Sequence, residues 1–140
     1  MELPMQTTTT QLDIDRLRAD VRGTVITPDD PTYDAARTVL PGDVDGHPAA
    51  IVRVADADDV ATVIGFARDS GAELAVRCGG HSGAGHSTTE GGIVIDLRDL
   101  KAIEVDAKDR TLWAEGGATA LVIEIGRVLY NALLGLLDYL

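Results

Sequence analysis

Residues 77–87 of the 140-residue chain read Arg-Cys-Gly-Gly-His-Ser-Gly-Ala-Gly-His-Ser. This glycine-rich stretch lies between two segments that have the pattern of β-strands. Glu73 to Arg77 has a strand pattern, with three apolar residues between two charged ones, and Ile93 to Leu97 is rich in β-branched apolar residues. Cys78 to Gly92 has no apolar periodicity and many glycines, so the sequence predicts a long loop that connects two strands.

The segment before the loop predicts a strand, a helix and a second strand. Ala50 to Val54 is a short apolar run, and Asp56 stands where a helix N-cap is expected. Apolar residues then follow the spacing of one helix face until Gly71, which is a typical helix stop. A right-handed parallel crossover is the default for such a unit, and we expect the strands of Ile51 and Val76 to pair directly.

The rest of the chain predicts an α+β fold with an antiparallel portion. Two short strands, Ile103 to Val105 and Thr111 to Glu115, flank a polar turn. A short helix is expected from Ile14 to Val21, with Gly23 as its stop, whereas Thr27 to Pro48 is expected to be ordered but irregular.

The last residues, Leu121 to Leu140, differ from the rest by being strongly apolar. Glu124, Arg127 and Asp138 interrupt the run, so a membrane span is not expected, and an amphipathic or buried helix is. The sequence therefore divides into an irregular lead-in at 1–47, a central domain at 48–120 and a divergent apolar tail at 121–140.

The composition excludes some classes of partner. Twelve Lys and Arg against twenty-three Asp and Glu give a net charge of −11, which would repel a nucleic-acid backbone. Such an acidic, lysine-poor surface is typical of a halophile, but a GC-rich genome would favour the same residues. The single cysteine, Cys78, and the absence of an export signal in the first residues favour the cytoplasm.

The glycine-rich loop itself suggests anion binding. Glycines admit positive φ, and a run of such residues can form a concave nest of backbone N–H groups that binds a pyrophosphate. A flexible surface loop would have the same composition. Neither a P-loop nor a dinucleotide-binding G-x-G-x-x-G before a helix is present. A metal site at His81 and His86 is not expected, because the two lie on a glycine loop rather than a helix and no nearby Cys or Glu pair completes a site.

The order of residues around His81 is more informative than the composition. Arg77-x-Gly79-Gly80-His81-Ser82-x-x-Gly85, followed by Gly91-Gly92-Ile93-Val94-Ile95-Asp96-Leu97, resembles the flavin-binding domain of the p-cresol methylhydroxylase and vanillyl-alcohol oxidase superfamily. The berberine bridge enzyme-like oxidases are the most similar members. The resemblance runs from about Pro48 to Thr119 and includes Ala114-Glu115-Gly116-Gly117-Ala118.

The resemblance implies FAD as the cofactor, with its pyrophosphate on backbone N–H groups of the loop. His81 matches the histidine that often bonds the 8α-methyl of the flavin, and a neutral imidazole is a competent nucleophile near pH 7. The other reading of His81 is a hydrogen bond to a non-covalent FAD. Ser82 and Gly85 match further cofactor contacts, and His86 matches a hydrogen-bonding loop residue.

Two residues before His81 have roles that the resemblance leaves open. Arg77 matches a residue that closes the loop onto the sheet or onto a phosphate, and a salt bridge with a carboxylate is the alternative. Cys78 is expected to be a small side chain beneath the loop, since the cysteinyl flavin link of the family comes from a motif further along the chain.

The tail does not resemble the continuation of the family, so the chain is similar to an N-terminal part of such an oxidase. The resemblance implies a flavin-dependent oxidoreductase that transfers a hydride from an alcohol, amine or sugar-like substrate to FAD. The alternative is a truncated, non-catalytic FAD-binding module or remnant. The resemblance assigns no catalytic residue to this part of the chain.

Overall fold

A computed structural model describes residues 12–40, 42–106 and 108–120, together with 123, 124, 126 and 128 of the following segment. Its helices and strands follow one another as α1 (Ile14–Asp20), β1 (Thr24–Ile26), α2 (Tyr33–Arg37), β2 (Ala50–Arg53), α3 (Ala57–Ser70), β3 (Leu74–Arg77), β4 (Ile93–Asp96), β5 (Ile103–Asp106) and β6 (Thr111–Ala114). Most of the predicted tail lies outside the described residues, and the predicted division into three parts stays a prediction.

A four-stranded sheet forms the centre of the fold, with the order β1-β2-β4-β3. β2, β4 and β3 are parallel, and β1 is antiparallel to β2. The expected strand–helix–strand unit is present, but the expected direct pairing of its two strands was wrong. β4 lies between them, with Val94 opposite both Ile51 and Ala75, so the loop returns the chain to the middle of the sheet.

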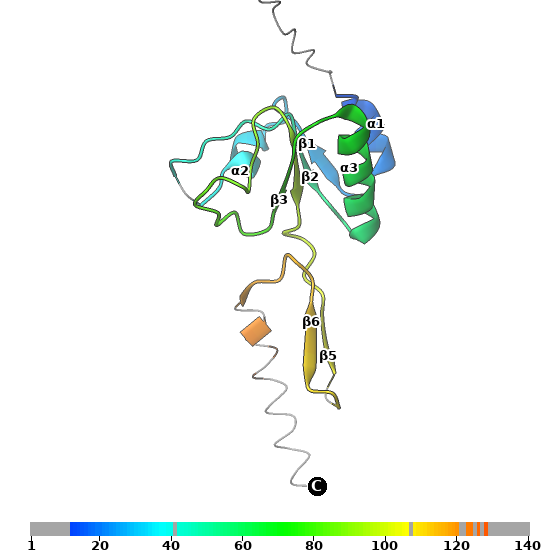
Figure 1. The fold of residues 1–140 in the computed structure, drawn as a ribbon, viewed down its shortest axis with the longest axis vertical. Helices are drawn as coiled ribbons and strands as arrows, with labels where there is room; N and C mark the ends of the chain where they lie inside the picture. Colours follow the sequence, from blue (N-terminus) through cyan, green and yellow to red (C-terminus); the bar gives the residue numbers. More distant parts are fainter. Residues whose placement is uncertain are drawn as a thin grey trace, which may run out of the picture.

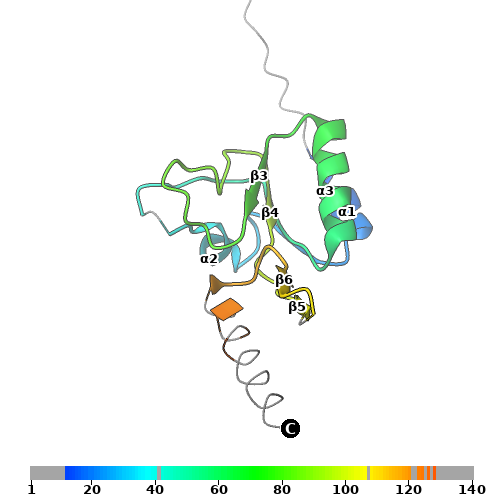
Figure 2. The same cartoon turned by 60° about the horizontal axis from the view of Figure 1, so that its bottom comes forward.

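Helices cover both faces of this sheet (Figures 1 and 2). α1 and α3 lie on one face, and α2 lies on the other. Because successive side chains of a strand point to opposite faces, each strand contributes to two cores. Ala50 and Val52 pack in the core with Leu17 and Val63, whereas Ile51 packs in the core of α2.

The limits of α3 follow the sequence signals closely. The Asp56 side chain accepts a hydrogen bond from the backbone N–H of Asp59, as an N-cap does. Gly71 ends the helix in the left-handed conformation, with φ of 69°. Both predicted boundaries are confirmed.

The expectation that residues 27–48 are irregular was wrong in part. β1 precedes this segment and α2 lies within it, and both elements are too short for hydrophobic periodicity to reveal. The hydroxyl of Tyr33 in α2 donates to the carbonyl of Pro48 at 2.7 Å, which fixes the helix against the start of β2.

β5 and β6 form the predicted antiparallel hairpin, which extends from one end of the sheet (Figure 1). The backbone N–H of Gly117 donates to the carbonyl of Leu100 at 2.8 Å and ties the hairpin to the chain after β4. No helix within the described ranges is both long and apolar enough to cross a membrane.

Candidate functional site

The carboxyl ends of the parallel strands meet at one edge of the sheet, and the glycine-rich loop leaves from this edge. Arg77, the last residue of β3, lies beside Asp96, the last residue of β4. Crevices outside the carboxyl ends of parallel strands are where α/β sheets commonly bind ligands. The register therefore brings the start of the loop to the place where a ligand site is expected.

Arg77 is buried and holds three segments together. Its Nη2 donates to the Asp96 carboxylate at 2.8 Å and to the carbonyl of Ala36 at 2.6 Å, and its Nη1 donates to the carbonyl of Arg37 at 3.4 Å. A salt bridge with a carboxylate was one of the two predicted roles, and the structure contains it. The side chain thereby fixes the end of α2 against the sheet beneath the loop.

Asp96 is the partner that sequence reasoning missed. It is fully buried and also accepts hydrogen bonds from the backbone N–H and the Nε of Arg98. Burial raises the pKa of its carboxyl, but the hydrogen bonds from Arg98 and Arg77 outweigh burial and hold the pKa below its usual range. Asp96 is therefore a fixed negative charge between two arginines.

The loop takes the positive-φ turns that its glycines permit. Gly80 has φ of 68° and Gly85 has φ of 80°. The buried Gly80 accepts a hydrogen bond at its carbonyl from the N–H of Leu40 at 3.1 Å, which anchors this part of the loop. Further on, the Oγ of Ser82 accepts a hydrogen bond from the N–H of His86 at 3.2 Å.

Four consecutive backbone N–H groups of the loop, those of residues 79–82, donate no hydrogen bond within the described part of the chain. Gly80 is buried and Ser82 is half-buried, and buried N–H groups are almost always paired, so these free donors are available to an anion. These donors and the turn at Gly80 fit a pyrophosphate, as the resemblance implies.

His81 is exposed, and its imidazole lies over Gly79. A Cβ added at Gly79 would come within 2.5 Å of the Cδ2 of His81 and within 2.8 Å of its Nε2. The glycine therefore supplies the space that the imidazole occupies. This relationship joins two residues of the predicted site that sequence reasoning treated separately.

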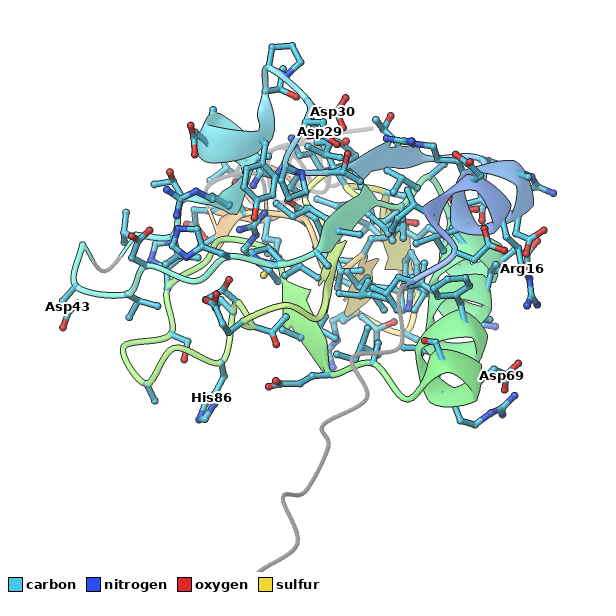
Figure 3. All side chains as sticks on the ribbon, turned by 90° about the horizontal axis from the view of Figure 1, so that it is seen from above. Arg16, Asp29, Asp30, Asp43, Asp69 and His86 are labelled. Carbon is cyan, nitrogen blue, oxygen red and sulfur yellow. The ribbon has the colours of Figure 1, made fainter. Side chains whose placement is uncertain are left out.

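The remaining predicted residues lie in different environments. Cys78 was expected beneath the loop, and that expectation was wrong, because its side chain is exposed. As Arg77 turns inward from β3, the alternation of the strand directs the next residue outward. His86 lies on the outer side of the loop and points away from the protein (Figure 3).

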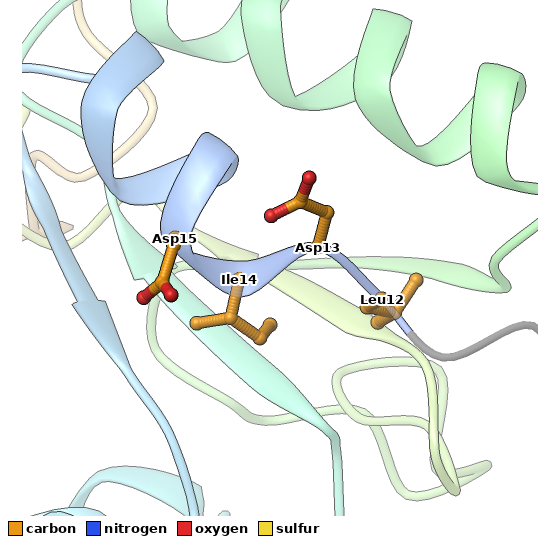
Figure 4. A pocket seen from close by; sticks show the side chains of 4 residues that line it. All are labelled: Leu12, Asp13, Ile14 and Asp15. Atoms are coloured by element: carbon orange, nitrogen blue, oxygen red, sulfur yellow. The ribbon is translucent and has the colours of Figure 1, made fainter.

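Other features of the surface are weaker candidates for a functional site. A pocket of about 400 Å³ lies at the start of α1, lined by Leu12 to Asp15, and Asp13 in it already caps the helix (Figure 4). Among the residues that the structure describes, no group of three or more His, Cys, Asp or Glu gathers as a metal site would require.

Comparison with known proteins decides the family. Residues 48–129, which are more than half of the chain, match the family described as FAD binding domain. The chain belongs to this FAD-binding family. Its cofactor is FAD, and the glycine-rich loop lies within the matched residues.

Two relatives show where in the family the chain lies. It is 39% identical over 97 residues to (R)-6-hydroxynicotine oxidase of Paenarthrobacter nicotinovorans, which covers 69% of the chain and 21% of that protein. It is 36% identical over 86 residues to berberine bridge enzyme-like 14 of Arabidopsis thaliana, which covers 60% of the chain and 15% of that protein. The FAD-binding chain thus spans about a fifth or less of the length of these relatives.

Solved structures agree with the sequence relatives. The crystal structure of 6-hydroxy-D-nicotine oxidase from Arthrobacter nicotinovorans superimposes with a TM-score of 0.68 at 39% identity, over 70% of this chain and 22% of that one. The structure of berberine bridge enzyme-like 28 from Arabidopsis thaliana superimposes with a TM-score of 0.67 at 29% identity, over 83% of this chain and 25% of that one. The predicted superfamily and the α+β flavin-binding fold are confirmed.

Proposed function

We propose that this chain is the FAD-binding portion of a flavin-dependent oxidoreductase, with His81 as the covalent attachment point of the flavin. The observation that carries the proposal is the run of free backbone N–H groups at residues 79–82, directly beside an exposed imidazole. The pyrophosphate would rest on these N–H groups. Because the imidazole of His81 belongs to the same loop that would hold the phosphates, an edge of the flavin could reach it.

The residues of the chain have separate roles in this proposal. Backbone N–H groups hold the phosphates, and the turns at Gly80 and Gly85 aim those groups. Arg77 and Asp96 fix the base of the loop through buried contacts, and Cys78 and Ser82 border the cofactor. His86 acts within the loop, where its N–H donates to Ser82. When bound, FAD supplies the hydride acceptor for an alcohol, amine or sugar-like substrate. We place this reaction in the cytoplasm, since the single cysteine requires no oxidising compartment.

A second candidate function is a non-catalytic FAD-binding module. The features that support cofactor binding, the free N–H groups of residues 79–82 and the turn at Gly80, serve this function equally well. Both candidates require that the loop bind FAD, and they differ in turnover of a substrate.

The test compares wild-type chain with His81→Ala after incubation with FAD in air-saturated buffer. Forming the bond replaces a C–H bond of the 8α-methyl by a C–N bond and leaves the flavin reduced, so dioxygen is needed to restore the oxidised, yellow form. Yellow colour that stays with the acid-precipitated protein, and a flavin adduct in the intact mass, are expected for the wild type. His81→Ala should lose the adduct and keep part of its non-covalent FAD, because the N–H groups belong to the main chain. His86→Ala is the matched control and should keep the adduct. An adduct that persists in His81→Ala would refute the attachment point.

A further inference from the structure

An open pocket of about 350 Å³ lies beside the start of the glycine-rich loop. It is lined by Thr38, Val39, Leu40, Cys78, Gly79 and Arg98. The hydrogen bond from Leu40 to Gly80 holds the two walls of this pocket together. Arg98 is the one charged side chain among the lining residues, and the motif of the loop does not include it.

Arg98 is fixed at one edge of its guanidinium and free at the other. Its Nε donates to both carboxylate oxygens of Asp96, at 3.0 and 2.8 Å, and its own backbone N–H donates to the same carboxylate. Its two terminal nitrogens donate no hydrogen bond to any residue that the structure describes. A guanidinium has four N–H donors on these two atoms, and here they are available to a ligand.

The charge around Asp96 is unbalanced in favour of an anion. One buried carboxylate faces two arginines, Arg77 and Arg98. The side chain of Arg77 is 1% exposed, whereas that of Arg98 is 39% exposed, so the surplus positive charge reaches the surface at Arg98, which lines this pocket and a neighbouring one. A side chain held by a buried anchor loses little entropy on binding.

We propose that Arg98 is the cationic ligand for the diphosphate of the cofactor, and that the pocket between the loop and residues 38–40 receives one of its phosphate groups. The inference rests on the proposed function, because it extends the same site. Gly79, which also lines the pocket, contributes its free N–H. A planar fork of N–H donors matches phosphate oxygens, and such charge-assisted hydrogen bonds are the stronger kind.

The experiment measures, by calorimetry on the full 140-residue chain, the binding of three compounds. FAD contains both a flavin and a diphosphate, ADP contains a diphosphate without the flavin, and riboflavin contains the flavin without phosphate. Arg98→Gln should weaken FAD and ADP about tenfold or more, as expected for a lost hydrogen bond to a charged group, and leave riboflavin unchanged. Arg98→Lys keeps the charge without the fork and should lose a smaller part of the affinity for ADP.

Arg53→Gln is the matched control. Arg53 also pairs with a carboxylate, that of Asp99 at 2.8 Å, but it lines only the neighbouring pocket, whereas Arg98 lines both pockets. This variant should bind ADP as the wild type does. If Arg98→Gln does not fold after Asp96 loses a partner, Arg98→Lys decides, and unchanged ADP affinity in this variant then overturns the role of the fork.

The outcomes separate the two proposals. Unchanged FAD and ADP affinity in Arg98→Gln, with a wild type that binds FAD and carries the adduct at His81, overturns the role of Arg98 alone. A wild type that binds neither FAD nor ADP overturns the proposed function as well. Equal loss of riboflavin and ADP in Arg98→Gln also overturns the inference, because it shows a collapse of the site and not the loss of a phosphate ligand.

Discussion

The imidazole of His81 occupies the space that a side chain at Gly79 would fill, since a Cβ there would come within 2.5 Å of the ring. Gly79, the first glycine of the pair, therefore leaves room for the orientation of the His81 ring. Gly80, the second, permits the positive-φ turn of the main chain. The two glycines serve different ends, and substitutions can separate them.

Gly79→Ala should displace the His81 ring while the fold is retained. Gly79 does not have positive φ, and the atoms in the way belong to a mobile side chain, so the melting temperature should change little. The yield of covalent flavin in the intact mass should fall severalfold. Gly83→Ala, where a Cβ would meet nothing within 4 Å, is the control and should keep the wild-type yield. An undiminished adduct in Gly79→Ala would contradict this role.

Gly80→Val should abolish FAD binding. A side chain at φ of 68° costs about 1–2 kcal/mol, and a β-branched one would also crowd Val39, 3.6 Å from the added Cβ. Gly71→Ala is the matched control, because Gly71 has nearly the same φ of 69° but nothing within 4 Å. Both variants should have a lower melting temperature, and only Gly80→Val should lose FAD binding in a fluorescence titration. Loss of FAD in both would show that general destabilisation is the cause.

Asp59 should make the fold sensitive to acid. Its buried carboxylate accepts hydrogen bonds from the backbone N–H groups of Arg22, Gly23 and Ala55, at 2.8 to 2.9 Å. Burial raises its pKa, but these hydrogen bonds outweigh burial and lower the pKa below the unfolded value of about 3.9. A lowered folded-state pKa stabilises the fold above that value, and the stability is lost as the pH falls below it.

The measurement is the free energy of unfolding between about pH 3 and pH 7. Asp59→Asn should lose about 1–3 kcal/mol at neutral pH, because an amide cannot accept all three hydrogen bonds, and it should vary less with acid than the wild type. Asp58→Asn is the control, since the Asp58 side chain is 85% exposed. An equally steep acid transition in Asp59→Asn would assign the sensitivity to other carboxylates.

Salt should stabilise the chain. Many of its acidic side chains point outward, Asp29, Asp43 and Asp69 among them (Figure 3). Salt shortens the range of their repulsion from about 10 Å at 0.1 M to about 3 Å at 1 M. The melting temperature should therefore rise in molar potassium chloride, and Asp43→Lys should show a smaller rise. A flat or falling curve would leave base composition as the better explanation of the acidic surface.

Local signals in the sequence were enough to predict the elements that hold the site. The cap at Asp56, the stop at Gly71 and the glycines of the loop each act through neighbouring residues, so their effects can be read from a short window. Strand order has no such signal. β4 enters between β2 and β3 because its apolar residues on both faces complete both cores, and only the assembled sheet shows this.

The same difference explains which site residues were missed. His81 and its glycines form one continuous motif, whereas Asp96 reaches Arg77 across 19 residues of sequence. Arg98 belongs to no motif of the loop, and its side chain is held in place by that buried carboxylate. A basic residue two positions after an acidic strand end is a weak signal until the register of β3 and β4 places both beside the loop.

The hairpin of β5 and β6 presents Val105, Leu112 and Trp113 with large exposed fractions, 56% for the indole. Trp113 is the one tryptophan of the chain. Its fluorescence is therefore an internal reporter of this hairpin alone: any partner or further stretch of polypeptide that covers the two strands would shift its emission to shorter wavelength. Docking on the hairpin can thus be followed optically without an added label.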